Sequence, residues 1–209
     1  MSPATAAAAE SVSAASHDDL PAWAELRTCI AQIEDCRTHV RELVDGLDDA
    51  RFNWSSAPKK WSIAQCIAHV TMAAEKFGPN IEMAVQDGRA KNVTGEPPFK
   101  LGFMGGMMAS MSSAYPPKLK MKAPPFANPP KKETYAIDEL VPRFLAWQDR
   151  LEQVAREAQG LDLARVKGKT GMPMMKFSLI EWLTIMPGHQ LRHLKQARDV
   201  RSHPDFPAA

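Results

Sequence analysis

The sequence predicts an all-α protein built on four helices, and three observations support that class. Apolar residues recur at spacings of three, four and seven over four segments, which is the period of a helix with one buried face. Residues that favour strands do not gather into alternating runs, and aromatic residues make up only 7% of the chain. Two of the four segments open with a capping box, a pattern typical of helix N-termini.

The 209 residues fit one domain with a tail at each end. Residues 1–17 are rich in Ala and Ser, which bury too little apolar surface to offset the entropy of the chain, so we expect a disordered tail there. We expect the helical domain at residues 18–200 and a C-terminal tail at residues 201–209.

The first helix is expected over residues 20–47, whose apolar side chains lie on one face. Asp19 is its expected cap, and Pro21 fits the first turn, where a missing N–H does no harm. The second helix follows the capping box of Ser62 and Gln65, whose side chains can each satisfy an otherwise orphan backbone N–H.

The second and third helices each contain a proline. Gly78-Pro79 predicts a bend or a break in the second helix, with a separate short helix after a break. The third helix is expected over residues 137–158, with Asp138 as its cap. That cap would leave Pro142 in the first turn, where no backbone hydrogen bond is lost.

A second capping box, Ser178 and Glu181, opens the fourth helix, which runs to about Val200. This helix is apolar nearly all round, as expected for one that is buried on more than one side. The connection at residues 90–134 is rich in proline and methionine. Because it is too long for a simple hairpin, we expect a crossover between the second and third helices.

Charge and apolar content exclude several functions. The formal net charge of +2 is too small to imply nucleic acid or an anionic membrane as the main partner. No apolar run reaches the roughly 18 residues needed to cross a bilayer, so no membrane span is expected. The three cysteines match no CxxC pattern, which is typical of reduced thiols, and we expect a cytoplasmic protein.

His189 and His193 lie four residues apart on the fourth helix, so their imidazoles project from one face. Both fall in the middle of an apolar stripe and are expected to point into the core. Unpaired polar groups cost free energy when buried, and a shared metal ion would remove that cost for both; a pair satisfied within the core is the alternative. A catalytic zinc ion needs a third protein ligand. His17, His39 and His203 are poor candidates, because two lie in the tails and one lies among charged residues.

Two motifs together resemble the DinB-like (YfiT-like) superfamily. They are WSIAQCIAHV, from Trp61 through His69, and HQLRHLKQ, from His189 onward. The resemblance covers about residues 20–200 and implies a four-helix bundle of up-up-down-down order, often a homodimer. It also implies a divalent metal ion, with zinc expected first and nickel or iron as alternatives. Carried over by position, the ligands are His69, His189 and His193.

The resemblance also implies a chemistry. In characterised members of that superfamily, the site serves transfer reactions that use low-molecular-weight thiols. The leading hypothesis is therefore a metal-dependent enzyme, either a thiol transferase or a hydrolase, acting on a small molecule such as a thiol. The alternative is a non-catalytic metal-binding or stress-response protein whose metal is structural or sensed. The sequence does not identify any acidic residue as a general base, so no catalytic residue is assigned.

Residues near the motifs allow further hypotheses. Gln196 lies on the face of the two histidines and could orient one of them or a bound water. Arg192 flanks that face and could attract an anionic substrate, but a solvated charge or a salt bridge is the favoured interpretation. Cys66 is a fourth ligand, a redox-sensitive thiol or, as favoured, a small buried core residue. Pro187-Gly188 predicts a kink in the fourth helix.

Methionines 104, 107, 108 and 111 repeat at helical spacing. Because thioethers bind Cu(I), a copper protein is one interpretation. The favoured one is the apolar face of a short helix that covers the open end of the bundle beside the metal. The basic run YPPKLKMKAPPFANPPKK is either a docking segment for another protein or a solvated connection.

Overall fold

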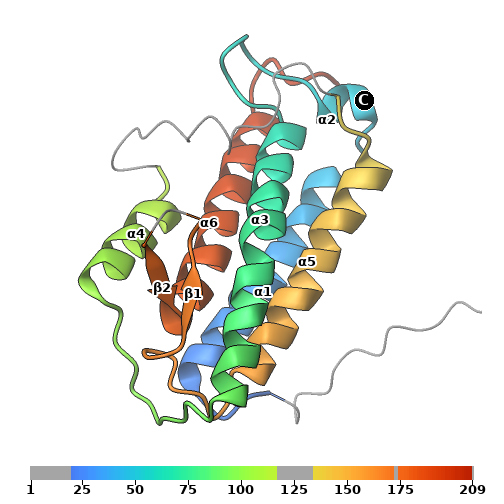
Figure 1. Ribbon diagram of the computed structural model, residues 1–209. Coiled ribbons are helices and arrows are strands. Elements are labelled where there is room, and N and C mark those ends of the chain that lie inside the picture. The colour runs from blue at the N-terminus through green and yellow to red at the C-terminus, as the bar shows by residue number, and fades with distance from the viewer. Residues whose placement is uncertain (1–19, 117–133, 172–173, 209) are drawn as a thin grey trace, which may run out of the picture.

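The computed structural model describes residues 20–116, 134–171 and 174–208, and within them the chain forms six helices and one small antiparallel sheet (Figure 1). The all-α class is confirmed, because the sheet holds only two strands of three residues each. The expected tail at residues 1–17 and the expected cap Asp19 lie outside the described residues. In chain order the elements are α1 (Ala24–Val44), α2 (Asp49–Phe52), α3 (Ile63–Ala90), α4 (Phe103–Ser113), α5 (Ile137–Glu157), β1 (Lys167–Lys169), β2 (Lys176–Ser178) and α6 (Leu179–Arg201).

The four long helices, α1, α3, α5 and α6, lie side by side, and their apolar faces enclose the core (Figure 1). Helix α1 packs against α5 and α6, and α3 packs against the same two helices. Leu26, Ile67, Phe144 and Leu194, one from each long helix, are fully buried. Burial of such a side chain stabilises the fold by about 1.5–3 kcal/mol. Helix α6 also contacts α4, which explains why it is apolar nearly all round.

Two ion pairs show that α3 and α5 run in the same direction. Arg143 pairs with Glu75 at 2.8 Å, and Arg150 pairs with Glu82 at 2.6 Å. A step of seven residues along α5 is thus matched by a step of seven residues along α3. Such a constant offset occurs only between parallel neighbours.

Helices α1 and α6 are also parallel to each other. Arg198, in the last turn of α6, pairs with Glu42, in the last turn of α1, at 3.0 Å. Figure 1 shows that α1 and α6 run one way and that α3 and α5 run the other way. The expected up-up-down-down order is therefore wrong, and the observed order is up-down-down-up.

The connections explain this order. Residues 45–62, which include α2, turn the chain back at one end of the helices, so α3 runs against α1 (Figure 1). The side-chain amide of Asn53, next to α2, exchanges hydrogen bonds with the backbone N–H and C=O of Tyr135, just before α5. Helix α5 therefore begins at the same end of the helices as α3, which places the two parallel to each other. Apolar periodicity does not encode helix direction, because both orders bury the same faces.

Two predicted helix starts are corrected. Helix α1 begins after Trp23, so Pro21 precedes the helix and does not lie in its first turn. The N-cap of α5 is Ala136, which places Asp138 in the first turn and Pro142 inside the helix. The carboxylate of Asp138 still stabilises the helix there, because it faces the positive end of the helix dipole.

Helix α3 is continuous through Pro79, so the break allowed for at Gly78-Pro79 does not occur. The reason is tertiary packing. A Cβ added to Gly78 would lie 2.1 Å from the ring of Trp147 on α5, so the glycine lets the two helices approach closely on the buried side of the proline. Helix α6 likewise continues through Pro187.

Both capping boxes form at the predicted residues, with Ser62 and Ser178 as N-caps. The carboxylate of Glu181 accepts hydrogen bonds from the backbone N–H of Ser178 at 2.7 Å and of Gly102 at 2.9 Å. A Cβ added to Gly105 would lie 2.1 Å from this carboxylate, so only glycine fits there. Glu181 therefore caps α6 and also fixes the N-terminal turn of α4 against it.

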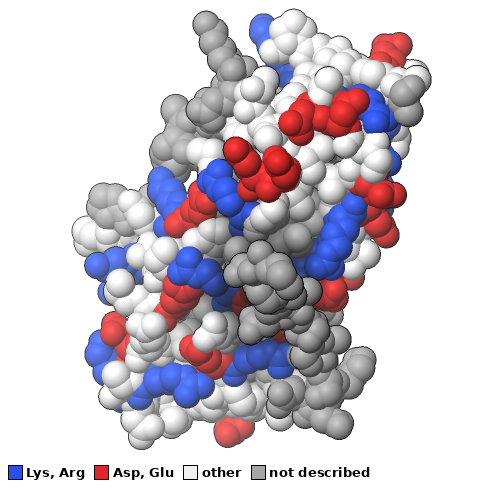
Figure 2. All heavy atoms as spheres, turned by 90° about the vertical axis from the view of Figure 1, so that its right-hand side faces the viewer, with Lys and Arg blue, Asp and Glu red and all other residues white. Residues whose placement is uncertain are grey.

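On the face shown in Figure 2, Lys and Arg are intermixed with Asp and Glu, so that face has no large area of one charge. None of the helices in the described ranges is long and apolar enough to cross a lipid bilayer.

Candidate metal centre

Three histidine side chains from α3 and α6 meet inside the protein. His69 lies on α3, and His189 and His193 lie on α6. One nitrogen from each ring lies within 4.8 Å of one nitrogen from each of the others. His69 and His193 are each 4% exposed, and His189 is partly buried. The fold thus brings together the three histidines of the two motifs, and no Cys, Asp or Glu of the described residues joins the cluster.

Local structure positions each ring. The capping box fixes where α3 begins, and His69 follows about two turns later. Because α6 continues unbroken past Pro187, His189 and His193 keep their spacing on one face, with ring centroids 4.7 Å apart. The indole of Trp61 covers the cluster, with its centroid 4.9 Å from that of His69 and 5.5 Å from that of His193.

Burial keeps the imidazoles of α6 neutral. It lowers the pKa of His189 from 6.5 to about 3, with further lowering by the charges of His69 and Arg192. Burial and the neighbouring positive charges also lower the pKa of His193. The Nδ1 of His193 lies 3.1 Å from Oε1 of Gln196, which accepts its hydrogen bond. The proton is then on Nδ1, and Nε2 keeps a lone pair that can bind a metal.

The geometry fits a divalent cation. The Nε2 atoms of His69 and His189 are 3.3 Å apart. In a tetrahedral zinc site with Zn–N distances of about 2.0–2.1 Å, two ligand nitrogens lie about 3.3 Å from each other. Neutral imidazoles that face one another from two helices are also the donor type that zinc, nickel and iron accept. The three residues therefore fit one such ion.

Two further side chains lie close to the cluster. Arg192 places Nη2 3.0 Å from Nε2 of His193 and donates from Nη1 to the carbonyl of Met111 at 3.2 Å. Cys66 is fully buried, and burial raises the pKa of its thiol, so the thiol stays protonated. Since it lies outside the cluster, its interpretation as a small core residue fits better than that of a fourth ligand.

Comparison with known proteins now identifies the family. A family model described as the DinB superfamily matches residues 32–197, which is most of the chain. The chain belongs to the DinB superfamily. The matched range contains both helices that carry the histidine cluster. No curated protein and no solved structure matches the chain.

The other histidines of this DinB-superfamily protein lie elsewhere. His39 is on α1, with Nδ1 2.7 Å from the carbonyl oxygen of Asp35. His203 follows α6, and its ring centroid lies 5.6 Å from that of Trp54. Neither belongs to the cluster, and His17 lies outside the described residues.

The methionine-rich segment forms α4, which packs along α6. Its C-terminal end lies beside the histidine cluster, where a Cβ added to Gly188 would come within 3.0 Å of the Cβ of Ser113. Its N-terminal half lies beside the start of α6, away from the cluster, and there Met104 is 47% exposed and Met107 is 41% exposed. Only the last turn of α4 is therefore placed to shape the metal site. Most of the basic proline-rich run, residues 117–132, lies outside the described residues.

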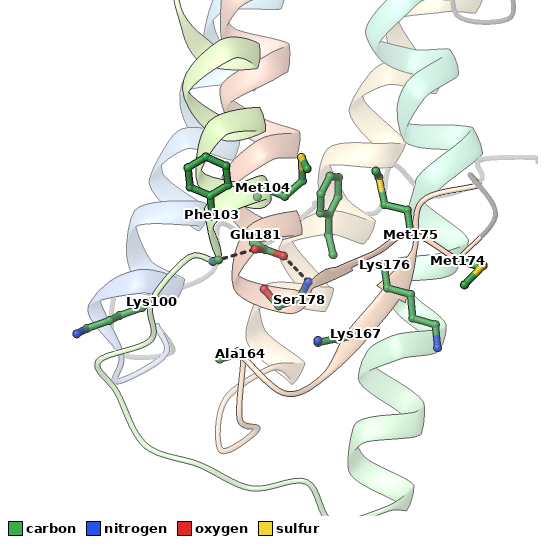
Figure 3. Close-up of a pocket in the computed structure, with 13 residues that line it drawn as sticks. Lys100, Phe103, Met104, Ala164, Lys167, Met174, Met175, Lys176, Ser178 and Glu181 are labelled. Carbon is green, nitrogen blue, oxygen red and sulfur yellow. Dashed lines mark hydrogen bonds between the residues drawn. The ribbon is translucent and has the colours of Figure 1, made fainter.

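A separate pocket of about 620 Å³ lies at the start of α6, about two turns before His189 (Figure 3). Figure 3 shows Glu181 at its base, where both hydrogen bonds of the carboxylate go to backbone N–H groups. None of the three clustered histidines lines this pocket. No local sequence pattern marks this pocket, because its wall comes from the start of α4, both strands and the start of α6. The labelled lining residues are Lys100, Phe103, Met104, Ala164, Lys167, Met174, Met175, Lys176, Ser178 and Glu181.

Proposed function

We propose that this protein binds one divalent metal ion on His69, His189 and His193 and is a metal-dependent enzyme, a thiol transferase or a hydrolase. The observation that carries the proposal is the convergence of three imidazoles, those of α6 held neutral by burial, within 4.8 Å of one another. Zinc is the expected ion, with nickel or iron as alternatives.

A divalent ion on three imidazoles keeps at least one position open, where it can lower the pKa of bound water toward 7 or hold a substrate thiolate. The chain itself supplies the other functions. Gln196 accepts a hydrogen bond from Nδ1 of His193 and so holds the imidazole in the tautomer whose Nε2 lone pair is available to a metal. Trp61 covers two of the rings and keeps bulk water from that side. His189, which is partly exposed, marks the side from which a small molecule enters.

The proposal includes a scaffold and a setting. The four long helices would act as a four-helix bundle that holds the site rigid, because ligands on two packed helices move less than ligands on loops. We further propose that the protein is a cytoplasmic homodimer and that it acts on a low-molecular-weight thiol. Neither nucleic acid nor a membrane is a partner in this proposal.

One observation favours a second candidate, a non-catalytic protein in which the metal is structural or sensed. No carboxylate of the described residues joins the histidine cluster, so a general base is not at hand. Thiol transfer does not need one if the metal already holds the thiolate. Hydrolysis suffers more from its absence.

Elemental analysis of the purified protein tests the metal site. We expect about one divalent ion per chain in the wild type, and in His193→Ala a fall in affinity of more than about a hundredfold, larger than the loss of a residue that only orients a ligand. His39→Ala, on α1 outside the cluster, is the matched control and should keep its metal. Full occupancy in His193→Ala, with helical content unchanged by circular dichroism, would refute the ligand assignment.

Cobalt replacement separates the enzyme from the second candidate. A thiol that enters the open position should change the visible spectrum of the cobalt protein, because a thiolate–cobalt bond absorbs where imidazole–cobalt bonds do not. A spectrum that no thiol alters would favour the structural or sensed metal.

A further inference from the structure

Arg192 is a half-buried cation without an acidic partner among the described residues. Its guanidinium makes two polar contacts, with the carbonyl oxygen of Met111 and with Nε2 of His193. Neither partner is a carboxylate.

Arg37 shows what the same fold does with a structural arginine. Its guanidinium is buried, with 10% of the side chain exposed, and pairs with three carboxylates. These belong to Glu34 at 3.0 Å, Asp149 at 2.8 Å and Glu152 at 2.7 Å. Buried charges are normally paired in this way. Arg192, which lies beside the histidine cluster, does not follow this rule, because no carboxylate of the described residues pairs with it.

The contact between Arg192 and His193 involves the nitrogen of the imidazole that faces the histidine cluster. Nη2 of Arg192 donates to the Nε2 lone pair, which is the lone pair that a metal ion would take. Once a metal takes it, that donor is left with no acceptor among the residues that the structure describes. The site then combines a divalent cation, three neutral imidazoles and an unpaired guanidinium, so its charge is strongly positive.

We propose that Arg192 binds a carboxylate of the substrate, so that the preferred thiols are small thiols that also carry a carboxylate. The planar guanidinium offers parallel N–H donors that match the two oxygens of a carboxylate. The hydrogen bond to Met111 fixes one edge of the guanidinium and leaves the edge near the histidines for the ligand. This inference rests on the proposed thiol chemistry and adds to it the feature by which one thiol is distinguished from another.

The test compares two thiols that differ in one group, 3-mercaptopropionate and its neutral amide, 3-mercaptopropionamide. Both are titrated into the full-length cobalt protein, and the dissociation constants are read from the thiolate–cobalt absorption. We expect the wild type to prefer the carboxylate by about tenfold to a hundredfold, the range for a hydrogen bond to a charged group. Arg192→Met should abolish the preference while keeping the cobalt and the affinity for the amide.

Two variants sharpen the result. Arg192→Lys keeps the charge without the fork and should recover only part of the preference. Arg198→Met is the matched control, because Arg198 lies on the same helix but is exposed and paired with Glu42. It should bind both thiols as the wild type does.

The outcomes are distinct. Equal affinity for the two thiols in the wild type, a preference that survives in Arg192→Met, or loss of cobalt from that variant would each overturn the role of Arg192 while the metal site stands. A wild type that binds no cobalt, or whose spectrum no thiol changes, would refute the proposed function and this inference with it.

Discussion

Helix α6 carries two buried polar clusters that the protein treats in opposite ways. Near its start, the carboxylate of Glu181 accepts hydrogen bonds from two backbone N–H groups. Two turns later, His189 and His193 meet His69, and the Nε2 atoms of two of the rings lie 3.3 Å apart. The first cluster is complete within the chain. The second brings three ring nitrogens together around a common point, which is an arrangement that fits a cation.

The difference separates a structural polar group from a functional one. Both clusters are buried, and both were visible in the sequence as motifs on the same helix. What distinguishes them is the partner of each polar atom. Both oxygens of Glu181 accept from backbone N–H groups, whereas the ring nitrogens of the histidines face one another, with Arg192 beside His193. Mutations should therefore affect stability at one cluster and metal binding at the other.

Glu181→Ala should have the largest effect on stability. It leaves two backbone N–H groups without their acceptor and loosens α4 from α6, so we expect the free energy of unfolding to fall by about 3 kcal/mol. The matched control is Glu139→Ala, an exposed glutamate three residues after the N-cap of α5, as Glu181 is in α6. Urea denaturation measures both. A loss of metal in Glu181→Ala with unchanged stability would remove the contrast between the clusters.

Gly105→Ala should come next. Its new Cβ would lie 2.1 Å from Glu181, so α4 must shift, and overpacking of this kind costs about 1–3 kcal/mol. Gly106→Ala, one residue later in α4, would meet nothing closer than 3.7 Å. That control should be neutral or more stable, because alanine favours helices over glycine. Thermal unfolding of the two variants decides, and equal melting temperatures would show that α4 is not held at Gly105.

Gln190→Leu should give the smallest change, and in the stabilising direction. Gln190 is fully buried between the metal-site histidines in sequence, yet neither polar atom of its side chain has a hydrogen-bond partner in the described part of the chain. Replacing an unsatisfied amide with an apolar group of similar size should raise the free energy of unfolding by about 1 kcal/mol. Gln153→Leu, exposed on α5, should gain nothing. Destabilisation in chemical denaturation would mean that the amide has a partner such as a buried water.

Several features of this protein could be predicted because they depend on neighbouring residues. Ser62 with Gln65 and Ser178 with Glu181 are capping boxes in any context that allows a helix, and both formed. The spacing of His189 and His193 places them on one face of α6 whatever surrounds it. Proline effects were predicted less well. The break allowed for at Pro79 did not occur, because packing of Gly78 against Trp147 holds the helix together.

Other features depend on segments that are distant in sequence. The directions of the helices, the pocket at the start of α6, the second role of Glu181 in holding α4 and the contact of Arg192 with Met111 gave no local signal. Each requires two or more elements to be placed in space. The third histidine, His69, lies between these cases, since family resemblance singled it out and the packing of α3 on α6 brought it to the other two.

The sequence by itself determined that the chain is helical, where the capped helices begin and which histidines are candidates, because these follow from periodicity and from contacts within a few residues. Tertiary structure alone decided that α3 and α5 run together against α1 and α6, and that Arg192, beside the cluster, has no acidic partner within the described ranges. Helix direction and charge pairing depend on which side chains from distant parts of the sequence come into contact. Apolar periodicity does not predict those contacts, because it reports only which face of each helix is buried.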